Sequence, residues 1–231
     1  MSALEQRILA AGDAIARIVG RLRALEYEFG NPDGVLPGPE PGTEAAIARI
    51  EREVGPLPLA LKLFWRHVGS VDLTGRPPAG WDGCEYPDPL VVAPPSHAVV
   101  ELKGFLADRA ERLRRNYPYV VPIAPDEYHK ADASGGMFYN VSVPAAADDP
   151  RLNDERHTLT FVAYLELAVR WGGFPGLDRC RDRHTWPLAA LRGTTPPRGS
   201  HDRPTRPPTN CGRGRLTRWP TTPTTCRTGT R

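Results

Sequence analysis

The chain has 231 residues, 40% of them hydrophobic, which is enough to bury one substantial core and favours one domain over two. The net charge of +3 hides a split: the segment from Arg179 onward has 12 Arg and two acidic residues, net +10, and the residues before it have 18 basic and 25 acidic residues, net −7. The N-terminal segment lacks the uninterrupted apolar core of a signal peptide, and no apolar run is long enough for a membrane span. We therefore expect a cytoplasmic protein that does not enter a membrane.

The first predicted element is a long amphipathic helix over residues 1–30. From Leu4 to Phe29 the apolar residues recur at spacings of four and three, which makes a seam of about four heptads. A seam this short more often docks on its own domain than on a second copy, so we expect a monomer rather than a dimer. Residues 31–42 are rich in Pro and Gly and are interpreted as a linker.

Two short amphipathic helices are predicted next, hinged at a Gly-Pro-Leu-Pro sequence. Thr43 is the expected N-cap of the first, and Gly55 can end it in the left-handed conformation. Pro58 suits the first turn of the second helix, which Gly69 closes. The apolar stripes of both helices indicate a core rather than an active site.

Strands and further helices follow this pair. Short strands are expected at 70–75 and 89–95, with an irregular loop between them, and Ser96 is expected to cap a helix over about 97–115. The clearest strands are residues 119–126 and 137–144, which are β-branched and end at Pro.

A last helix is expected to begin at Thr158 or Thr160 and to end at Gly172-Gly173. The order of the predicted elements indicates an α+β domain rather than alternating βαβ units.

Several segments, in this order, resemble the SUKH superfamily, the Smi/Knr-like domain. They are IARIEREVGPLPLALKLFWRHVGSVDL, DPLVV, PIAPDEYHKADASGG with MFYNVSVP, and TFVAYLELAVRWGGFPGL, within residues 43–177. The resemblance implies a twisted, largely antiparallel sheet packed against several helices. It also implies a protein-binding module, such as an immunity protein that neutralises a toxin of a polymorphic toxin system, often a nuclease. It implies no catalytic residues, and we expect no enzyme, cofactor or metal.

Acidic and aromatic residues on two loops are the predicted partner-binding residues, because interfaces use aromatic anchors within a polar rim and an acidic body suits a basic toxin. They are Trp81, Asp82, Glu85, Tyr86, Asp88, Asp126, Glu127, Tyr128 and Asp132.

The loop from Asp126 to Ser134 also allows other interpretations. A carboxylate, His129 and a hydroxyl are the parts of an acyl-transfer site, which makes a hydrolase the alternative function. Asp126, His129 and Asp132 could also bind a metal ion, although oxygen ligands on a loop are a weak pattern. The simplest interpretation is that Asp126 and Asp132 form Asx-type turns and that His129 is solvated.

The segment 179–231 is expected to be a disordered basic tail, because Arg, Thr, Pro and Gly dominate it. It is either a nucleic-acid-binding arm or the product of a change of reading frame near Asp178. The four cysteines, Cys84, Cys180, Cys211 and Cys226, form no close pairs, and no disulfide framework is predicted.

Overall fold

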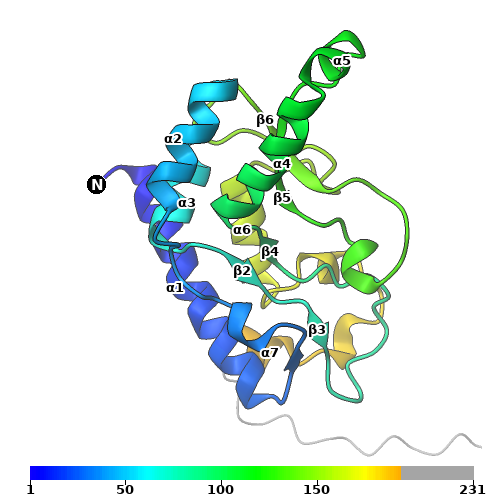
Figure 1. Ribbon diagram of the computed structural model, residues 1–231. Helices are drawn as coiled ribbons and strands as arrows, with labels where there is room; N and C mark the ends of the chain where they lie inside the picture. Colours follow the sequence, from blue (N-terminus) through cyan, green and yellow to red (C-terminus); the bar gives the residue numbers. More distant parts are fainter. Residues whose placement is uncertain (194–231) are drawn as a thin grey trace, which may run out of the picture. The chain divides into compact units, whose positions relative to one another are not determined.

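The structure, a computed structural model, describes residues 1–193, which belong to one compact α+β unit (Figure 1). Its helices are α1 (Ala3–Ala24), α2 (Thr43–Val54), α3 (Leu59–His67), α4 (Pro95–Ala107), α5 (Arg109–Arg114), α6 (Phe161–Arg170) and α7 (Leu188–Arg192). Its strands are β1 (Glu28–Phe29), β2 (Val71–Asp72), β3 (Gly75–Arg76), β4 (Val91–Val92), β5 (Val120–Ala124) and β6 (Tyr139–Ser142). Short 3-10 turns are η1 (Pro32–Gly34), η2 (His129–Ala131), η3 (Pro175–Asp178) and η4 (Arg183–Thr185). The expected fold class is confirmed.

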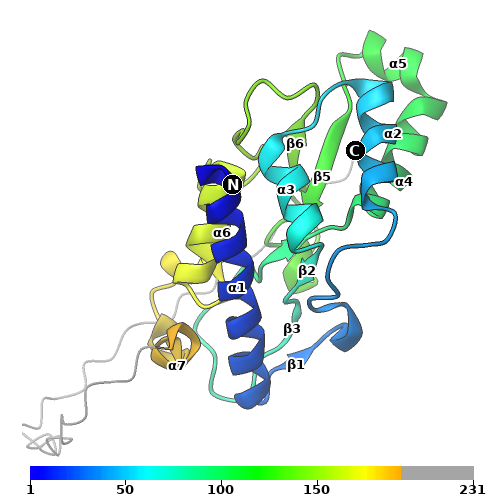
Figure 2. The same ribbon diagram turned by 90° about the vertical axis from the view of Figure 1, so that its left-hand side faces the viewer.

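Helix α1 belongs to the core of this unit. Its N-cap Ser2 forms a capping box with Glu5, and its apolar seam is buried against α3 and α6, which lie beside it in Figure 2. The helix ends at Ala24, earlier than the seam predicts, because Glu26 takes a positive φ of 61°. Phe29, the last seam residue, pairs instead with Gly75 in the β1–β3 ladder. The apolar seam therefore packs against other elements of the same chain.

The segment 31–42 packs on the body and is not a free linker, which corrects the sequence-based interpretation. Val35 is fully buried, and its carbonyl accepts a hydrogen bond of 3.0 Å from the backbone N–H of Asp72. Gly69 has φ +88°, and a Cβ there would stand 2.0 Å from the carbonyl oxygen of Gly38. This close backbone approach needs glycine and fixes the segment against the end of α3.

Helices α2 and α3 form the predicted hinged pair. Gly55 ends α2 as expected, but with φ +98° and ψ −178° it is not in the left-handed helical conformation that was predicted. Gly42 rather than Thr43 is the N-cap, because the Thr43 hydroxyl donates to the carbonyl of Glu40. Pro58 precedes α3 as its N-cap. Phe64 of α3 packs edge-on against Phe161 of α6, with ring centroids 5.5 Å apart, at the centre of the core.

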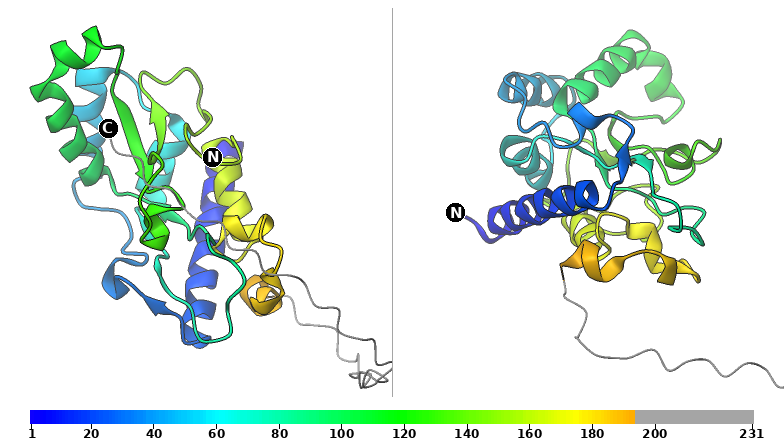
Figure 3. Two further views of the ribbon diagram at one scale, coloured as in Figure 1. Left: turned by 90° about the vertical axis from the view of Figure 1, so that its right-hand side faces the viewer. Right: turned by 90° about the horizontal axis from the view of Figure 1, so that it is seen from below.

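The strands form three short antiparallel ladders, β1–β3, β2–β4 and β5–β6 (Figure 3). Val71 pairs with Val92 in the second, and Val121 pairs with Val141 in the third. A hydrogen bond of 2.7 Å from the N–H of Ala93 to the carbonyl of Ile123 connects the second ladder to the third. The strand pairing is antiparallel, as expected, but the sheet is small.

The helix expected at 97–115 is two helices, α4 and α5, because the backbone leaves the helical conformation at Asp108 (φ −117°, ψ 20°). Ser96 does not cap α4, because the helix already begins at Pro95. The Ser96 hydroxyl instead donates a hydrogen bond to the carboxylate of Glu40. Thr160 does cap α6, accepting a hydrogen bond from the N–H of Ala163. All residues of α5 lie near the surface, where it extends beyond α4 in Figure 1.

The ordered chain continues beyond Asp178, where the basic tail was expected to begin. Trp186 and Leu191 are buried, with 4% and 0% of their surface exposed, and α7 packs on α1. The guanidinium groups of Arg183 and Arg192 lie 5.3 Å and 4.6 Å from the centre of the Trp171 ring. The expected disorder is therefore wrong for 179–193. The change of reading frame near Asp178 stays a prediction, and so does the nucleic-acid-binding arm, most of which lies outside the described residues.

Candidate functional site

A groove of about 420 Å³ lies between α4, β5 and the loop that joins β5 to β6. Residues of four segments line it, namely Ala93, His97, Glu101, Pro122, Ala124, Pro125, His129, Gly136, Met137 and Phe138. Its volume is within the range of ligand and side-chain pockets. We take it as the candidate functional site and refer to it as the groove.

Short side chains form the floor of the groove. Successive residues of a strand point to opposite faces, so Val121 and Ile123 of β5 enter the core while Pro122 and Ala124 face the groove. Ala93, which follows β4, adds a third short side chain. Large residues on the core face and small ones on the other face leave a hollow above the strand.

The rim of the groove exposes large apolar side chains. Met137 and Phe138 are 59% and 38% exposed, and Tyr128, on the same loop, is 39% exposed. Glu101 lines the opposite wall and forms no salt bridge within residues 1–193. The floor and rim can accommodate an apolar group, and Glu101 can pair with a cation or accept a hydrogen bond beside it.

Asp126 and His129 form a close pair at one end of the groove. The carboxylate is buried and accepts backbone N–H bonds from Tyr128 and His129, of 2.8 Å and 3.0 Å, while Nδ1 of His129 lies 2.7 Å from its Oδ2. Burial raises the pKa of Asp126, but these hydrogen bonds outweigh that effect and hold the pKa below its usual value. The predicted Asx-type turn at Asp126 is confirmed.

The other parts of a catalytic site are not assembled around this pair. Within residues 1–193, no hydroxyl or thiol group hydrogen-bonds to His129, and Ser134 is exposed. Asp132 lines a different depression, beside β1 and β3. No group of three or more His, Cys, Asp or Glu in the described residues is arranged to hold a metal ion, so the metal-site interpretation fails there.

A buried ion pair supports the loop from below. The side chains of Lys130 and Asp88 are both fully buried, with Nζ 2.5 Å from Oδ1, and Nζ lies 4.7 Å from the centre of the Tyr139 ring. The Tyr139 hydroxyl donates to Glu127 at 2.8 Å. Burial and the nearby carboxylates raise the pKa of Tyr139, so its hydroxyl stays protonated and remains a donor. This network fixes Glu127 and Lys130, which flank the His129 position.

The structure separates the nine predicted partner-binding residues into two groups. Asp88, Asp126 and Glu127 are buried and already paired, so they cannot form the rim of an interface, which corrects the prediction. The other six are partly or fully exposed: Trp81, Asp82, Glu85, Tyr86, Tyr128 and Asp132.

Of these six exposed residues, Tyr128 is the neighbour of His129 in the chain and is therefore close to the groove. The centroid of its ring lies 5.0 Å from that of Tyr86. Trp81 packs on Trp186, with ring centroids 5.3 Å apart. The sequence analysis missed His97, Glu101, Met137 and Phe138. The alternation of large and small residues in 120–124 was a usable signal for the floor, but nothing local indicated that α4 supplies the opposite wall.

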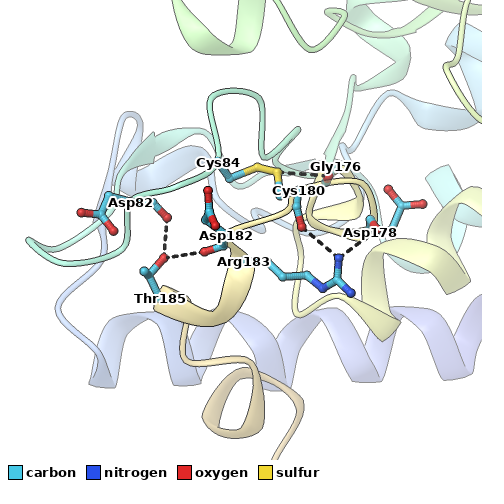
Figure 4. The surroundings of a disulfide bond; sticks show 8 residues. All are labelled: Asp82, Cys84, Gly176, Asp178, Cys180, Asp182, Arg183 and Thr185. Atoms are coloured by element: carbon cyan, nitrogen blue, oxygen red, sulfur yellow. Dashed lines mark hydrogen bonds between the residues drawn. A yellow bond between two sulfur atoms is a disulfide. The ribbon is translucent and has the colours of Figure 1, made fainter. Parts of the chain in front are cut away.

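Cys84 and Cys180 form a disulfide bond, which corrects the expectation that no disulfide would form (Figure 4). The two residues are 96 positions apart, and their Cα atoms are 5.4 Å apart. The bond connects the loop after β3 to the segment between η3 and η4. Two cysteines this far apart in the chain form no sequence motif from which their pairing could be predicted.

None of the helices in residues 1–193 combines the length and the apolar character needed to cross a bilayer. Comparison of the chain with protein-family models, with curated proteins and with solved structures found no match.

Proposed function

We propose that this protein is a non-enzymatic protein-binding module that acts as a monomer in the cytoplasm, as an immunity protein neutralising a toxin of a polymorphic toxin system. The immunity role rests on the resemblance of residues 43–177 to the SUKH superfamily. The groove carries the binding role, because Met137 and Phe138 remain exposed beside a floor of short side chains.

The chemistry of the groove favours a partner that inserts a bulky apolar side chain next to a basic group. The floor leaves room for the side chain, and Met137 and Phe138 can close over it, as anchors do at the centre of interfaces. Glu101 offers a carboxylate at the wall that has no salt-bridge partner among the described residues. Residues 1–193 have 22 basic and 26 acidic residues, and this net charge of −4 favours the approach of a basic partner such as a nuclease.

The first observation to make is whether a toxin gene lies next to this gene, and the test is a pull-down and inhibition assay with its product. We expect Met137→Ala with Phe138→Ala to weaken binding about tenfold or more, the usual loss when an anchor is truncated. Glu101→Lys should mainly slow association. The matched control is Leu113→Ala with Tyr117→Ala, because these side chains are 51% and 65% exposed but do not line the groove.

Equal binding by the groove variant and the control would overturn the groove as the interface, and absence of binding to the toxin would overturn the immunity role. One observation favours a second function: the Asp126–His129 pair has the geometry of a carboxylate orienting a general base. Loss of protection in His129→Ala and Ser134→Ala, with the Met137 and Phe138 variant unaffected, would favour that hydrolase over a binding module.

A further inference from the structure

The loop between β3 and β4 has no regular structure and is attached to the C-terminal part of the described chain at several points. The Cys84–Cys180 bond lies at its centre (Figure 4). On one side of it, the hydroxyl of Thr185 donates to the carbonyl of Asp82, and Trp81 packs on Trp186. On the other, the N–H of Gly176 donates to the carbonyl of Pro87 at 3.0 Å. We call residues 77–90 the clasp loop.

The noncovalent contacts of the clasp loop are imperfect. The indole N–H of Trp186, whose ring packs on Trp81, is buried without a hydrogen-bond partner in the described residues. An unpaired buried polar group costs free energy each time the surface around it closes. The Cys84–Cys180 bond therefore opposes opening of the clasp loop at the Trp81–Trp186 contact, while the Asp88–Lys130 pair holds the end of the loop that precedes β4.

The two cysteines lie at the edge of the core rather than deep inside it. Both cysteines are partly exposed. Cys180 lies between Arg179 and Arg181 in the chain, and the Arg183 guanidinium donates to its backbone carbonyl at 2.9 Å, so the segment that carries Cys180 is rich in positive charge. The Cys180 sulfur is also 3.5 Å from the carbonyl oxygen of Gly176, which can accept from the thiol once the bond is reduced.

The clasp loop also supports the groove. Two residues after Cys84, the ring of Tyr86 packs edge-on against Tyr128, and four residues after it Asp88 pairs with buried Lys130. Tyr128 and Lys130 directly flank His129, which lines the groove. A change in the position of Cys84 therefore reaches the groove wall through two short connections.

We propose that the Cys84–Cys180 bond is a reversible redox site whose reduction by a dithiol releases the clasp loop and loosens the wall of the groove at Tyr128. A thiolate of the dithiol attacks the Cys84 sulfur, the S–S bond breaks, and Cys180 leaves as a thiolate that takes up a proton. The second thiolate of the reductant then attacks the mixed disulfide and frees Cys84, which is also protonated. Two electrons pass to the protein, and the reductant becomes a disulfide. This redox proposal does not depend on which partner the groove binds.

The test uses the full chain with Cys211→Ser and Cys226→Ser, so that one cysteine pair remains. Peptide mapping without reductant should find Cys84 linked to Cys180. On addition of dithiothreitol, hydrogen exchange of residues 77–90 should rise about tenfold or more and that of 126–134 less, while β6 stays protected. Removal of the reductant and reoxidation should restore the slow exchange. Cys84→Ser with Cys180→Ser should show the fast exchange without reductant.

Three results would overturn the proposal. Free thiols at both positions in the untreated protein would mean that the bond does not form. Unchanged exchange at 77–90 after complete reduction would mean that the noncovalent contacts suffice to hold the loop. A rise that includes β6 would mean that the bond only holds the whole fold together, because a switch acts locally.

Discussion

Lys130 is a residue at which one substitution should strongly lower the stability of the fold. Its ammonium group is fully buried, and Asp88 is the only carboxylate within ion-pair distance in the described residues. A buried charge is tolerated only with a partner, and the ring faces of Tyr139 and Tyr164, 4.7 Å and 6.0 Å from Nζ, add a smaller attraction.

Breaking this pair should destabilise the protein strongly. We expect Lys130→Met to lower the free energy of unfolding by about 3–5 kcal/mol, because Asp88 is left buried and unpaired. The double variant Asp88→Asn with Lys130→Met should recover part of the loss, since Asn carries no charge and tolerates the positive φ of 53° at this position. Urea unfolding measures both. A loss below about 1 kcal/mol in the single variant would contradict the buried pair.

His157 lies between two carboxylates, with Nδ1 2.7 Å from Glu155 and Nε2 3.0 Å from Asp178. Burial lowers the pKa of His157, but the hydrogen bonds to Glu155 and Asp178 outweigh burial and raise it. Burial raises the pKa of Glu155, and its hydrogen bonds, chiefly the one to His157, bring it below the usual value. Both ring nitrogens therefore donate, and the protonated imidazole joins the turn before α6 to η3.

This arrangement predicts a pH dependence with a definite sign. The folded state raises the pKa of His157 above 6.5, so its stabilising effect is complete below that pH and is lost as the pH rises through the folded pKa. The unfolding free energies of wild type and His157→Gln should therefore converge above pH 6.5, measured by urea unfolding across the range. His97→Gln is the control, because His97 is exposed and forms no ion pair within residues 1–193. A difference that grows with pH would contradict the proposed protonation.

At the scale of the element, the sequence predicted helix caps, helix ends and strands correctly where they depend on interactions between neighbouring residues. Thr160 caps α6, Gly55 ends α2, and the β-branched run at 119–126 contains β5, because each depends on a few neighbouring residues. The break between α4 and α5 was missed, since Asp108 has no strong helix-breaking character in the sequence.

Long-range pairing was the part that the sequence could not indicate. Asp88 looked like a surface acid because it lies in a polar loop, but Lys130, 42 residues away, neutralises it in the core. Glu127 likewise accepts a hydrogen bond from Tyr139, and Cys84 forms a disulfide bond with Cys180. In each case one half of a pair was assessed without its partner. The part of the groove most accessible to prediction was its floor, where short and β-branched residues alternate along β5.

At the scale of the whole molecule, the boundary of the folded unit decides which truncations are tolerated. A chain that ends at Gly193 keeps every contact described, and we expect its thermal midpoint to stay within a few degrees of the full chain. A chain that ends at Asp178 loses buried Trp186 and Leu191 and the disulfide partner of Cys84. Removal of one large core side chain costs about 3–5 kcal/mol, and loss of a disulfide about 2–4 kcal/mol, so this chain should unfold or aggregate. Calorimetry and soluble yield distinguish the outcomes. Equal stability of the two truncated chains would show that 179–193 contributes little to the core, and would restore Asp178 as the boundary.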